Sequence, residues 1–338
     1  MSNKKLNSNI LITGGAGYIG SHTAIELLNL NYKIFIIDNL SNASIKNIDA
    51  ITRITKKKFK FIKCDIKNYY KLNSIFKKFN FHAVIHFAGL KSVQESFVDP
   101  IKYYENNVYG SINLVKCMKL HGVKKIIFSS SASVYDAESI SPIDELSKLN
   151  PSSPYGKTKL SIENFLYDIY CENKNWSILN LRYFNPIGCH KSSLISENSS
   201  INSTNIMPKI INVAKKNIKY LEVYGNNNLT LDGSGIRDFL NINDLVDGHC
   251  AALKLLLKEN CFYNINIGTG RGTSVLKLIN IFEKANKVKV PYKIVGKKKG
   301  DDPIKYASAR KAKKLINWSS QYSLIDACKD VWKAEQLK

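Results

Sequence analysis

The first half of the chain alternates short apolar runs with segments whose apolar residues recur at helical spacing. Apolar runs separated by helical segments indicate parallel strands that are buried on both faces of a sheet. Right-handed crossovers between such strands give a doubly wound α/β fold. We therefore predict strands at Asn9–Thr13, Tyr32–Ile37, Phe59–Lys63, His82–Phe87, Lys124–Ser129 and Ser177–Leu181.

Helical patterns fill the intervals between these strands, at Tyr18–Leu30, Tyr69–Phe79 and Pro100–Leu120. A further helix is expected after Ser153-Pro154, because Ser caps helices and Pro suits their first turn. Residues 192–205 are rich in Ser and Asn, which predicts a long loop. Beyond it the segments are shorter and mixed. We predict two domains, residues 1–185 and a smaller lobe of residues 186–338, with some chain crossing back to the sheet.

Composition places the chain among ordinary globular proteins, since 44% of its 338 residues are hydrophobic and 23% are charged. No apolar stretch approaches the roughly 20 residues that span a bilayer, and the N-terminus lacks a signal-peptide core. The seven cysteines form no C-x-x-C pair and are not clustered with histidines. We expect a soluble cytoplasmic protein with core thiols, no metal site and no membrane partner.

The formal charge of +23 raises the question of nucleic-acid binding. Only five of the 50 basic residues are Arg, whose planar fork matches base edges, and the lysines are scattered in runs of three at most. The abundance of Lys, Ile and Asn is explained by drift in an A/T-rich genome. A solvated Lys-rich surface with no nucleic-acid partner is the preferred interpretation.

A glycine-rich turn links the first strand to the first helix, with Gly14, Gly17 and Gly20 at a G-x-x-G-x-x-G spacing. Glycine permits the tight turn and the close approach of a pyrophosphate to the helix N-terminus. The next strand ends at Asp38, where a carboxylate can accept hydrogen bonds from ribose hydroxyls and favour NAD over NADP. Together these features predict a Rossmann-like dinucleotide site. Asp65, at the end of the third strand, is either an adenine contact or a turn residue.

A second constellation combines Ser131 with Tyr155 and Lys159. Tyr155 and Lys159 are four residues apart, so a helix projects both from one face. An ammonium group beside a phenol is expected to lower the pKa of the phenol, which then accepts a proton from a substrate hydroxyl. Ser131 follows a strand and can bond the same hydroxyl. The alternative is an ordinary surface pair, which the nucleotide motif disfavours.

These motifs resemble the extended short-chain dehydrogenase/reductase superfamily, and within it the UDP-glucose 4-epimerase (UDP-galactose 4-epimerase) family. The resemblance covers nearly the whole chain. The matching blocks, in order, are Thr13–His22, Asp38–Leu40, His86–Lys91, Tyr103–Val108, Phe128–Tyr135, Ser153–Lys159, Leu181–Gly188, Asp232–Asp238 and Gly300–Pro303.

The resemblance implies an isomerase that oxidises C4 of a UDP-hexose transiently with tightly held NAD. Tyr155 would be the base, Lys159 would hold the ribose and tune Tyr155, and Ser131 would assist proton transfer. The NAD site would further include Gly14, Gly17, Tyr18, Ile19, Gly20, Asp38, Asn39, Leu40, Ser41, Asn42, Ala43, Asp65, Ile66, Phe87, Ala88, Gly89, Leu90, Lys91, Asn106 and Phe184. The UDP-sugar would contact Ser131, Tyr155, Asn185, Asn205, Ile206, Glu222, Val223, Tyr224, Arg237, Lys298 and Asp301.

The chain departs from the family pattern at a few positions. Lys298 stands where Arg is usual, and a point charge cannot clamp a diphosphate bidentately. Lys305, followed by Tyr306, replaces a Tyr that limits the hexose pocket, so tolerance of N-acetylated sugars is open. Asp136 replaces a Gly, and Asn241 replaces a His.

Alternatives from the same and other classes remain. A 4,6-dehydratase needs an Asp-Glu pair after Ser131, where this chain has Ala132 and Ser133. Other nucleotide-sugar epimerases, acting on UDP-N-acetylglucosamine or UDP-glucuronate, stay possible, as does a non-catalytic NAD-binding regulator. The resemblance also implies a homodimer that pairs the helices Pro100–Leu120 and Pro154–Cys171.

Overall fold

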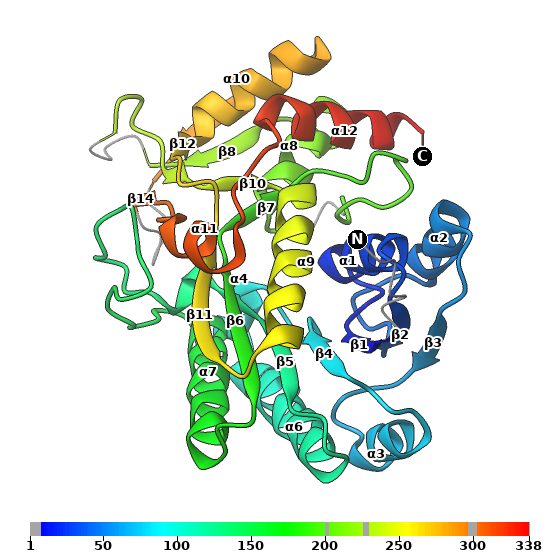
Figure 1. Cartoon of the computed structure of the whole chain (residues 1–338). Helices are drawn as coiled ribbons and strands as arrows, with labels where there is room; N and C mark the ends of the chain where they lie inside the picture. The colour runs from blue at the N-terminus through cyan, green and yellow to red at the C-terminus, as the bar shows by residue number, and fades with distance from the viewer. Residues whose placement is uncertain (1–7, 200–202, 226–229, 297–302, 338) are drawn as a thin grey trace. The chain divides into compact units, whose positions relative to one another are not determined.

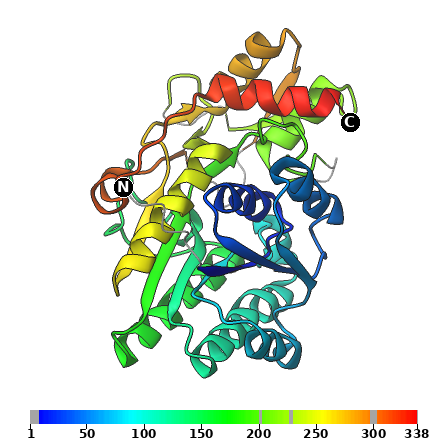
Figure 2. The same cartoon turned by 45° about the vertical axis from the view of Figure 1, so that its right-hand side comes forward.

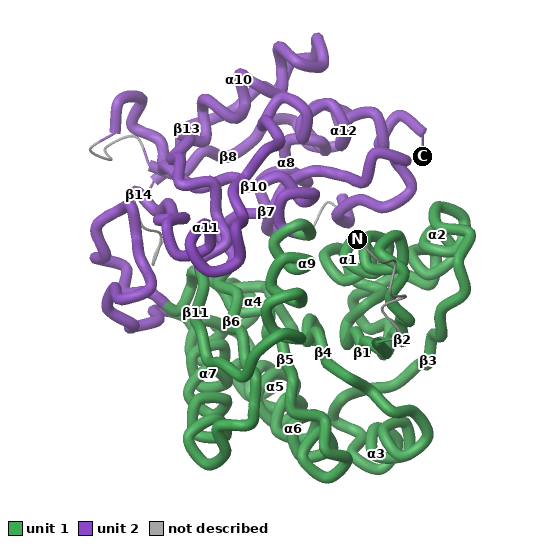
Figure 3. The backbone as a smooth tube through the Cα atoms, in the orientation of Figure 1, with its two compact units in different colours: residues 1–134, 153–182, 246–265 green, residues 135–152, 183–245, 266–338 purple. Residues whose placement is uncertain are grey.

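The computed structural model describes residues 8–199, 203–225, 230–296 and 303–337. Two compact units divide the chain (Figure 3). Unit 1 contains residues 1–134, 153–182 and 246–265, and unit 2 contains residues 135–152, 183–245 and 266–338. The chain therefore leaves unit 1 and later returns to it. The predicted single boundary between residues 185 and 186 is simpler than this observed division of the chain.

Unit 1 is built on a seven-stranded sheet in the order β11-β6-β5-β4-β1-β2-β3 (Figure 1). The pairs β1/β2, β1/β4, β2/β3 and β4/β5 are parallel. This order confirms the predicted doubly wound α/β fold, and each predicted strand is present to within two residues at either end. The strands are β1 (Asn9–Thr13), β2 (Lys33–Asp38), β3 (Lys60–Lys63), β4 (Ala83–His86), β5 (Lys125–Ser131), β6 (Ser177–Tyr183) and β11 (Phe262–Ile267).

Helices cover both faces of this sheet (Figures 1 and 2). One face carries α1 (Tyr18–Asn29), α2 (Ile45–Thr55) and α9 (Ile242–Lys258), and the other carries α3 (Tyr69–Lys78), α6 (Gly110–Leu120) and α7 (Pro154–Glu172). Ile10, Leu11 and Ile12 of β1 are fully buried. Their burial explains why the central strands have continuous apolar sequences rather than alternating ones.

The predicted helix Pro100–Leu120 consists of three segments. It begins as α5 (Pro100–Tyr103), continues as the π-helical segment η1 (Tyr104–Tyr109) and ends as α6. The short helix α4 (Val93–Val98) precedes these three segments. Asn107 lies in the π-helical segment, and its side chain bonds Leu90 and Thr158 of neighbouring segments. Such π-helical insertions are frequent at functional sites. Hydrophobic spacing does not reveal a single inserted residue.

Helix starts follow their local sequence. At α7 the Ser153 side chain accepts a hydrogen bond from the Gly156 amide at 3.1 Å, and Pro154 occupies the first turn, as predicted. Asn68 caps α3 through the Lys71 amide in the same way. At α1 the N-cap is Gly17, and no side chain caps this helix.

Unit 2 is a mixed lobe of small sheets and helices, as predicted. Three sheets pair β7 (Asn185–Ile187) with β10 (Phe239–Asn241), β8 (Leu221–Tyr224) with β13 (Tyr292–Val295), and β9 (Ile236–Arg237) with both β12 (Thr273–Ser274) and β14 (Ile304–Lys305). The helices are α8 (Ile206–Ala214), α10 (Val275–Asn286), α11 (Arg310–Ile316) and α12 (Leu324–Gln336).

A separate apolar core holds unit 2 together, and Phe239, Leu278, Phe282 and Val331 belong to it. The described part of residues 192–205 contains no helix or strand, in agreement with the predicted loop. Across the described residues, no helix is long and apolar enough to cross a membrane.

Candidate active site

The glycine-rich turn forms a backbone cradle between β1 and α1. Gly14 has a φ of +68°, and a Cβ atom there would lie 2.6 Å from the Ala88 amide nitrogen. A Cβ atom on Gly20 would collide with the Gly14 carbonyl oxygen. Because the N-cap Gly17 offers no side chain, the first amides of α1 have no side-chain cap. This arrangement suits an anion such as a pyrophosphate, held by backbone N–H groups and the positive helix end.

Asp38 ties this cradle to the end of β2. Its carboxylate accepts hydrogen bonds from the amides of Ala16, at 3.1 Å, and Leu40, at 2.8 Å. Burial raises the pKa of Asp38, and the two amide hydrogen bonds oppose that rise. The next residue, Asn39, donates a 3.0 Å hydrogen bond to Asp65. Asn39 therefore lies between two carboxylates: Asp38 precedes it in the sequence, and Asp65 accepts a hydrogen bond from its side chain.

Asp65 also accepts a hydrogen bond from the Lys67 amide at 2.8 Å, so it does serve as a turn residue. It lines a cavity of about 500 Å³ together with Lys67, Asn68, Tyr69, Tyr70 and Tyr109. A role as turn residue leaves room for a ligand contact, because each carboxylate oxygen accepts more than one hydrogen bond.

The loop after β4 lies beside the cradle and beside Lys159. The Ala88 amide donates to Thr13 Oγ1 at 3.3 Å, and the Leu90 amide donates to Asn107 Oδ1 at 2.8 Å. A Cβ atom on Gly89 would be 3.8 Å from Lys159 Nζ. Asn107 therefore fixes this loop. Sequence analysis selected its neighbour Asn106, which donates to Asn107 Oδ1 at 3.0 Å.

Ser131, Tyr155 and Lys159 come together where β5 ends and α7 begins. The hydroxyl of Ser131 lies close enough to that of Tyr155 to act on it, and it hydrogen-bonds Ser133 Oγ at 3.1 Å. Lys159 Nζ donates a 2.6 Å hydrogen bond to the Ser129 carbonyl oxygen and lies 5.8 Å from the centroid of the Tyr155 ring. The structure thus brings the three predicted catalytic side chains into one cluster. Such a cluster can move a proton to or from a hydroxyl group of a ligand.

The electrostatics of this cluster differ from the sequence expectation. Burial raises the pKa of Tyr155, and the hydrogen bond with Ser131 only partly opposes the rise. Burial also lowers the pKa of Lys159 to about 8, against the opposing charge of Glu163. The spacing of Tyr155 and Lys159 indicates the effect of the lysine charge, but it does not show the loss of hydration that both groups undergo on burial.

A buried histidine lies near Lys159. His86 bonds Thr13 Oγ1 at 2.7 Å and Ser111 Oγ at 2.8 Å. Burial, and secondarily the charge of Lys159, lower the pKa of His86 to about 3. The imidazole is therefore neutral at physiological pH. Sequence analysis did not select His86 or Asn107 as site residues, because their roles depend on contacts between segments far apart in sequence.

Apart from Ser131 and Tyr155, the candidate substrate residues belong to unit 2. Arg237 Nη1 donates to the carbonyl oxygens of Ile236, at 2.8 Å, and Pro303, at 3.5 Å. Tyr224 donates to Glu222 at 2.9 Å, so these two side chains share one face of β8. Val223 is 1% exposed and belongs to the core of the unit, which leaves only its backbone for contact with a ligand.

Asn205 is the N-cap residue of α8, where its side chain donates to Glu197. Asn185 is exposed on β7, and the preceding Phe184 is buried. Lys305 pairs with Arg237 across β14 and β9. Lys298 and Asp301 lie outside the described residues.

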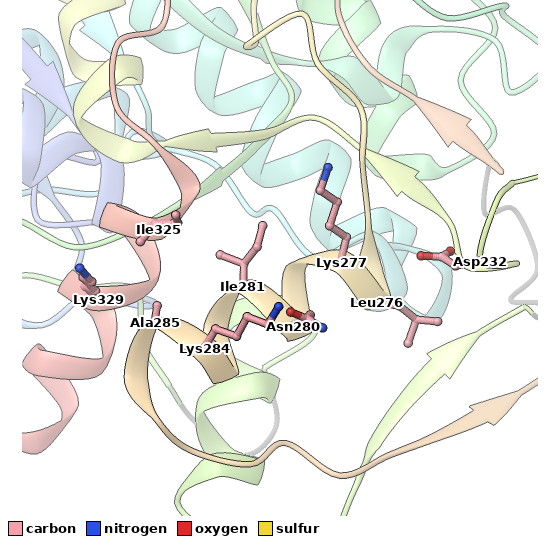
Figure 4. Close-up of a pocket in the computed structure, with 9 residues that line it drawn as sticks. All are labelled: Asp232, Leu276, Lys277, Asn280, Ile281, Lys284, Ala285, Ile325 and Lys329. Carbon is pink, nitrogen blue, oxygen red and sulfur yellow. The ribbon is translucent and has the colours of Figure 1, made fainter.

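A larger cavity of about 750 Å³ lies in unit 2 between α10 and α12 (Figure 4). None of the candidate site residues lines it. Its wall combines Asp232, Leu276, Lys277, Asn280, Ile281, Lys284, Ala285, Ile325 and Lys329. The described residues contain no group of three or more His, Cys, Asp or Glu side chains arranged to hold a metal ion.

Comparisons with known proteins agree with this geometry. The family model described as GDP-mannose 4,6 dehydratase matches residues 11–331. A UDP-glucose 4-epimerase of Bacillus subtilis (strain 168) is 43% identical over 324 residues, which cover 96% of each chain.

Solved structures give the same result. A UDP-glucose-4-epimerase from Stenotrophomonas maltophila, with bound NAD and formylated UDP-arabinopyranose, has a TM-score of 0.96 and 38% identity over 98% of each chain. One from Bifidobacterium longum, in complex with NAD+ and UDP, has a TM-score of 0.94 and 39% identity over 98% of each chain.

A doubly wound sheet, a glycine cradle and a Ser-Tyr-Lys cluster together define a dinucleotide-dependent enzyme of the extended short-chain dehydrogenase/reductase type. The chain belongs to the family that the GDP-mannose 4,6 dehydratase model describes, and within it to the UDP-glucose 4-epimerases. The name of the family model does not fix the reaction, since Ala132 and Ser133 stand where a dehydratase needs an acid and a base.

Proposed function

We propose that this protein interconverts UDP-glucose and UDP-galactose by reversible epimerisation at C4 of the hexose, as an NAD-dependent isomerase. The observation that carries the proposal is the convergence of Ser131, Tyr155 and Lys159 beside the glycine cradle. The names of the relatives identify the substrate class, and they support a role in galactose and carbohydrate metabolism.

The residues of the cradle fit NAD. Gly14, Gly17 and Gly20 leave the backbone open to a pyrophosphate, and Asp38 stands at the end of β2, where a ribose is expected. Some of the other candidate residues of the NAD site neighbour these four in sequence or lie in the loop after β4. Asp65 and Ile66 follow β3, Asn106 lies in η1, and Phe184 follows β6. When bound, NAD supplies a reversible hydride acceptor for the C4 hydrogen of the sugar.

Tyr155 takes the proton of the sugar 4-hydroxyl and returns it after the sugar has turned. Its raised pKa disfavours the phenolate, so a nearby positive charge is needed before Tyr155 can act as a base. Lys159 provides such a charge 5.8 Å from the ring centroid. Ser131 lies near Tyr155 and can bond the same sugar hydroxyl. The proton is thereby held between two side chains and is not lost to solvent.

Substrate binding is assigned to unit 2. The Arg237 guanidinium suits the two phosphates of UDP, because its fork binds such oxygens in pairs. Asn185, Asn205, Ile206, Glu222, Tyr224, the backbone of Val223, Lys298 and Asp301 complete the proposed contacts with the UDP-sugar. A firm grip on UDP with few contacts to the hexose would allow the sugar to present its other face.

A homodimer and a cytoplasmic location belong to the same proposal. Large apolar side chains are exposed along the helices expected to form the contact, namely Ile101, Tyr104, Tyr109, Ile112 and Tyr167. A second copy of the chain would cover them. All seven cysteines are free thiols, which suits a reducing compartment. Sedimentation at micromolar concentration tests the dimer, and a monomer would contradict it.

The experiment for the activity uses the purified protein and UDP-galactose with no added NAD, followed by proton NMR. The expected result is the appearance of UDP-glucose up to an equilibrium mixture. Conversion only after NAD is added would contradict tight binding. No conversion in either case would contradict the proposed reaction, and UDP-N-acetylglucosamine and UDP-glucuronate would then be tested in its place.

A further inference from the structure

A buried ion pair lies one helical turn beyond Lys159. Glu163 accepts hydrogen bonds from Arg182 Nε at 3.0 Å and from Arg182 Nη2 at 2.6 Å. Its Oε1 atom also accepts a hydrogen bond from Ser130 Oγ. The two side chains are 3% and 0% exposed, respectively. The carboxylate therefore joins α7 to β5 and β6 in the interior of unit 1.

The cluster and this ion pair share one face of α7. Tyr155, Lys159 and Glu163 follow one another at intervals of four residues. On β5, three consecutive serines are their partners. Tyr155 lies near Ser131, Lys159 donates to the Ser129 carbonyl oxygen and Glu163 accepts from Ser130 Oγ. The contact between Glu163 and Ser130 continues this series along α7 and β5. It therefore fixes the rotation of α7 about its own axis relative to β5.

Buried ion pairs add little net stability, because both charges lose their hydration. The groups around Lys159 indicate a different role for the ion pair between Glu163 and Arg182. Among the described groups, Tyr155 lies on the same helix, the neutral His86 faces Lys159 from β4, and Arg182 lies beyond Glu163 on β6. Glu163 is the described carboxylate whose charge acts on Lys159, and it favours the protonated amine.

We propose that Glu163, anchored by Arg182, is a positioning residue that keeps the Lys159 ammonium group charged and aligned beneath Tyr155. This inference rests on the proposed function, since it supplies the positive charge that Tyr155 needs to act as a base. Arg182 holds the carboxylate in place through two hydrogen bonds. The ion pair thus links the framework of the sheet to the proton-transfer step.

The test measures the titration of Lys159 directly, by the ¹³Cε signal of labelled lysine in the NAD-loaded protein. The signal is assigned by its loss in Lys159→Met. In Glu163→Gln we expect it to titrate at a lower pH, by about one unit or more, since a close opposite charge shifts a pKa by that amount. The alkaline limb of kcat against pH is expected to move in the same direction. Glu163→Asp keeps the charge and is expected to retain the wild-type titration.

Two further variants separate positioning from stability. Glu335→Gln also removes a buried carboxylate from an ion pair, here with the partly exposed Lys215 of unit 2, and is expected to leave the titration of Lys159 unchanged. Should Glu163→Gln fail to fold, Glu163→Gln with Arg182→Met removes both charges and is expected to show the lower titration. If Lys159 titrates as in the wild type, either in Glu163→Gln or in Glu163→Gln with Arg182→Met, the inference is overturned. The titration needs no turnover, so it is read separately from conversion of UDP-galactose, whose failure would count against the proposed function alone.

Discussion

Lys159 Nζ donates a 2.6 Å hydrogen bond to the carbonyl oxygen of Ser129, and the lysine side chain is buried. This single bond replaces the several water molecules that an exposed ammonium group would bind. The loss of hydration lowers the pKa of Lys159 from its ordinary value of 10.5 to about 8. Lys159 is therefore held charged at neutral pH at the expense of stability.

Lys159→Met is expected to increase the free energy of unfolding at pH 7, by on the order of 1–3 kcal/mol. Between pH 8 and 10.5 the unfolded wild-type chain binds more protons than the folded one, so wild-type stability rises with pH in this window. The variant lacks this rise, and the two stabilities converge near pH 10. Urea unfolding at pH 7 and pH 10 measures both values. A variant that is less stable than the wild type at both pH values would contradict this account.

Tyr155→Phe removes one oxygen atom and the proton acceptor with it. Turnover of UDP-galactose is expected to fall by about 10²- to 10⁴-fold, the range for loss of a general base. Bound nucleotide, measured after acid release, is expected to remain at the wild-type ratio. Tyr103→Phe is the control, since Tyr103 is a buried neighbour whose ring lies 6.5 Å from that of Tyr155 and whose hydroxyl bonds Glu95. Equal loss of turnover in both variants would argue against a specific role for Tyr155.

Gly14→Ala and Gly122→Ala form a matched pair. Both glycines have a φ near +70°, at +68° and +70°, so each substitution incurs a backbone cost of roughly 1–2 kcal/mol. Gly122 has no atom within 4 Å of the added Cβ, whereas at Gly14 that Cβ would lie 2.6 Å from the Ala88 amide nitrogen. Only Gly14→Ala is expected to lose bound NAD, together with a larger drop in unfolding temperature. Retention of NAD by Gly14→Ala would show that the cradle can widen.

Asp238→Asn tests the hydrogen bonding of a buried carboxylate in unit 2. The buried Asp238 carboxylate accepts from the Thr269 amide and hydroxyl, and from the amides of Gly270 and Ala307. An Asn side chain has only one accepting oxygen, so two of these amides lose their partner. The expected loss is about 3 kcal/mol in the free energy of unfolding. Asp232→Asn, at an exposed turn bonded to Ser234 and Ser274, is expected to lose much less. Similar losses in the two variants would be the contrary result.

Sequence patterns predicted the sheet well because each strand is buried on both faces and bounded by turn residues. Asn9–Thr13 and the start of α7 at Pro154 agree with the structure at the residue level. The grouping of Ser131, Tyr155 and Lys159 could also be predicted, since one pair shares a helical face and Ser131 follows a strand. These features depend on local spacing, which a sequence displays directly.

Features that depend on burial or on contacts between distant segments were not predicted. Asn107 bonds a loop 17 residues away and Thr158, which lies 51 residues away, and nothing in its own segment indicates this. The raised pKa of Tyr155 follows from loss of hydration, which spacing does not show. The pairing of Glu163 with Arg182 had a partial signal, since Glu163 is four residues beyond Lys159. Its partner on β6 required the fold.

The position of β6 between β5 and β11 bears on how the protein is made. Every residue of β6 is buried, and β11 is contributed by residues 262–267. A nascent chain that has emerged only to residue 185 therefore presents β6 as an open sheet edge, the kind of edge that promotes aggregation. The nucleotide-binding unit is complete only after much of unit 2 has been synthesised. The two units are thus coupled during biosynthesis, and a contiguous N-terminal gene fragment would not encode an independent dinucleotide-binding module.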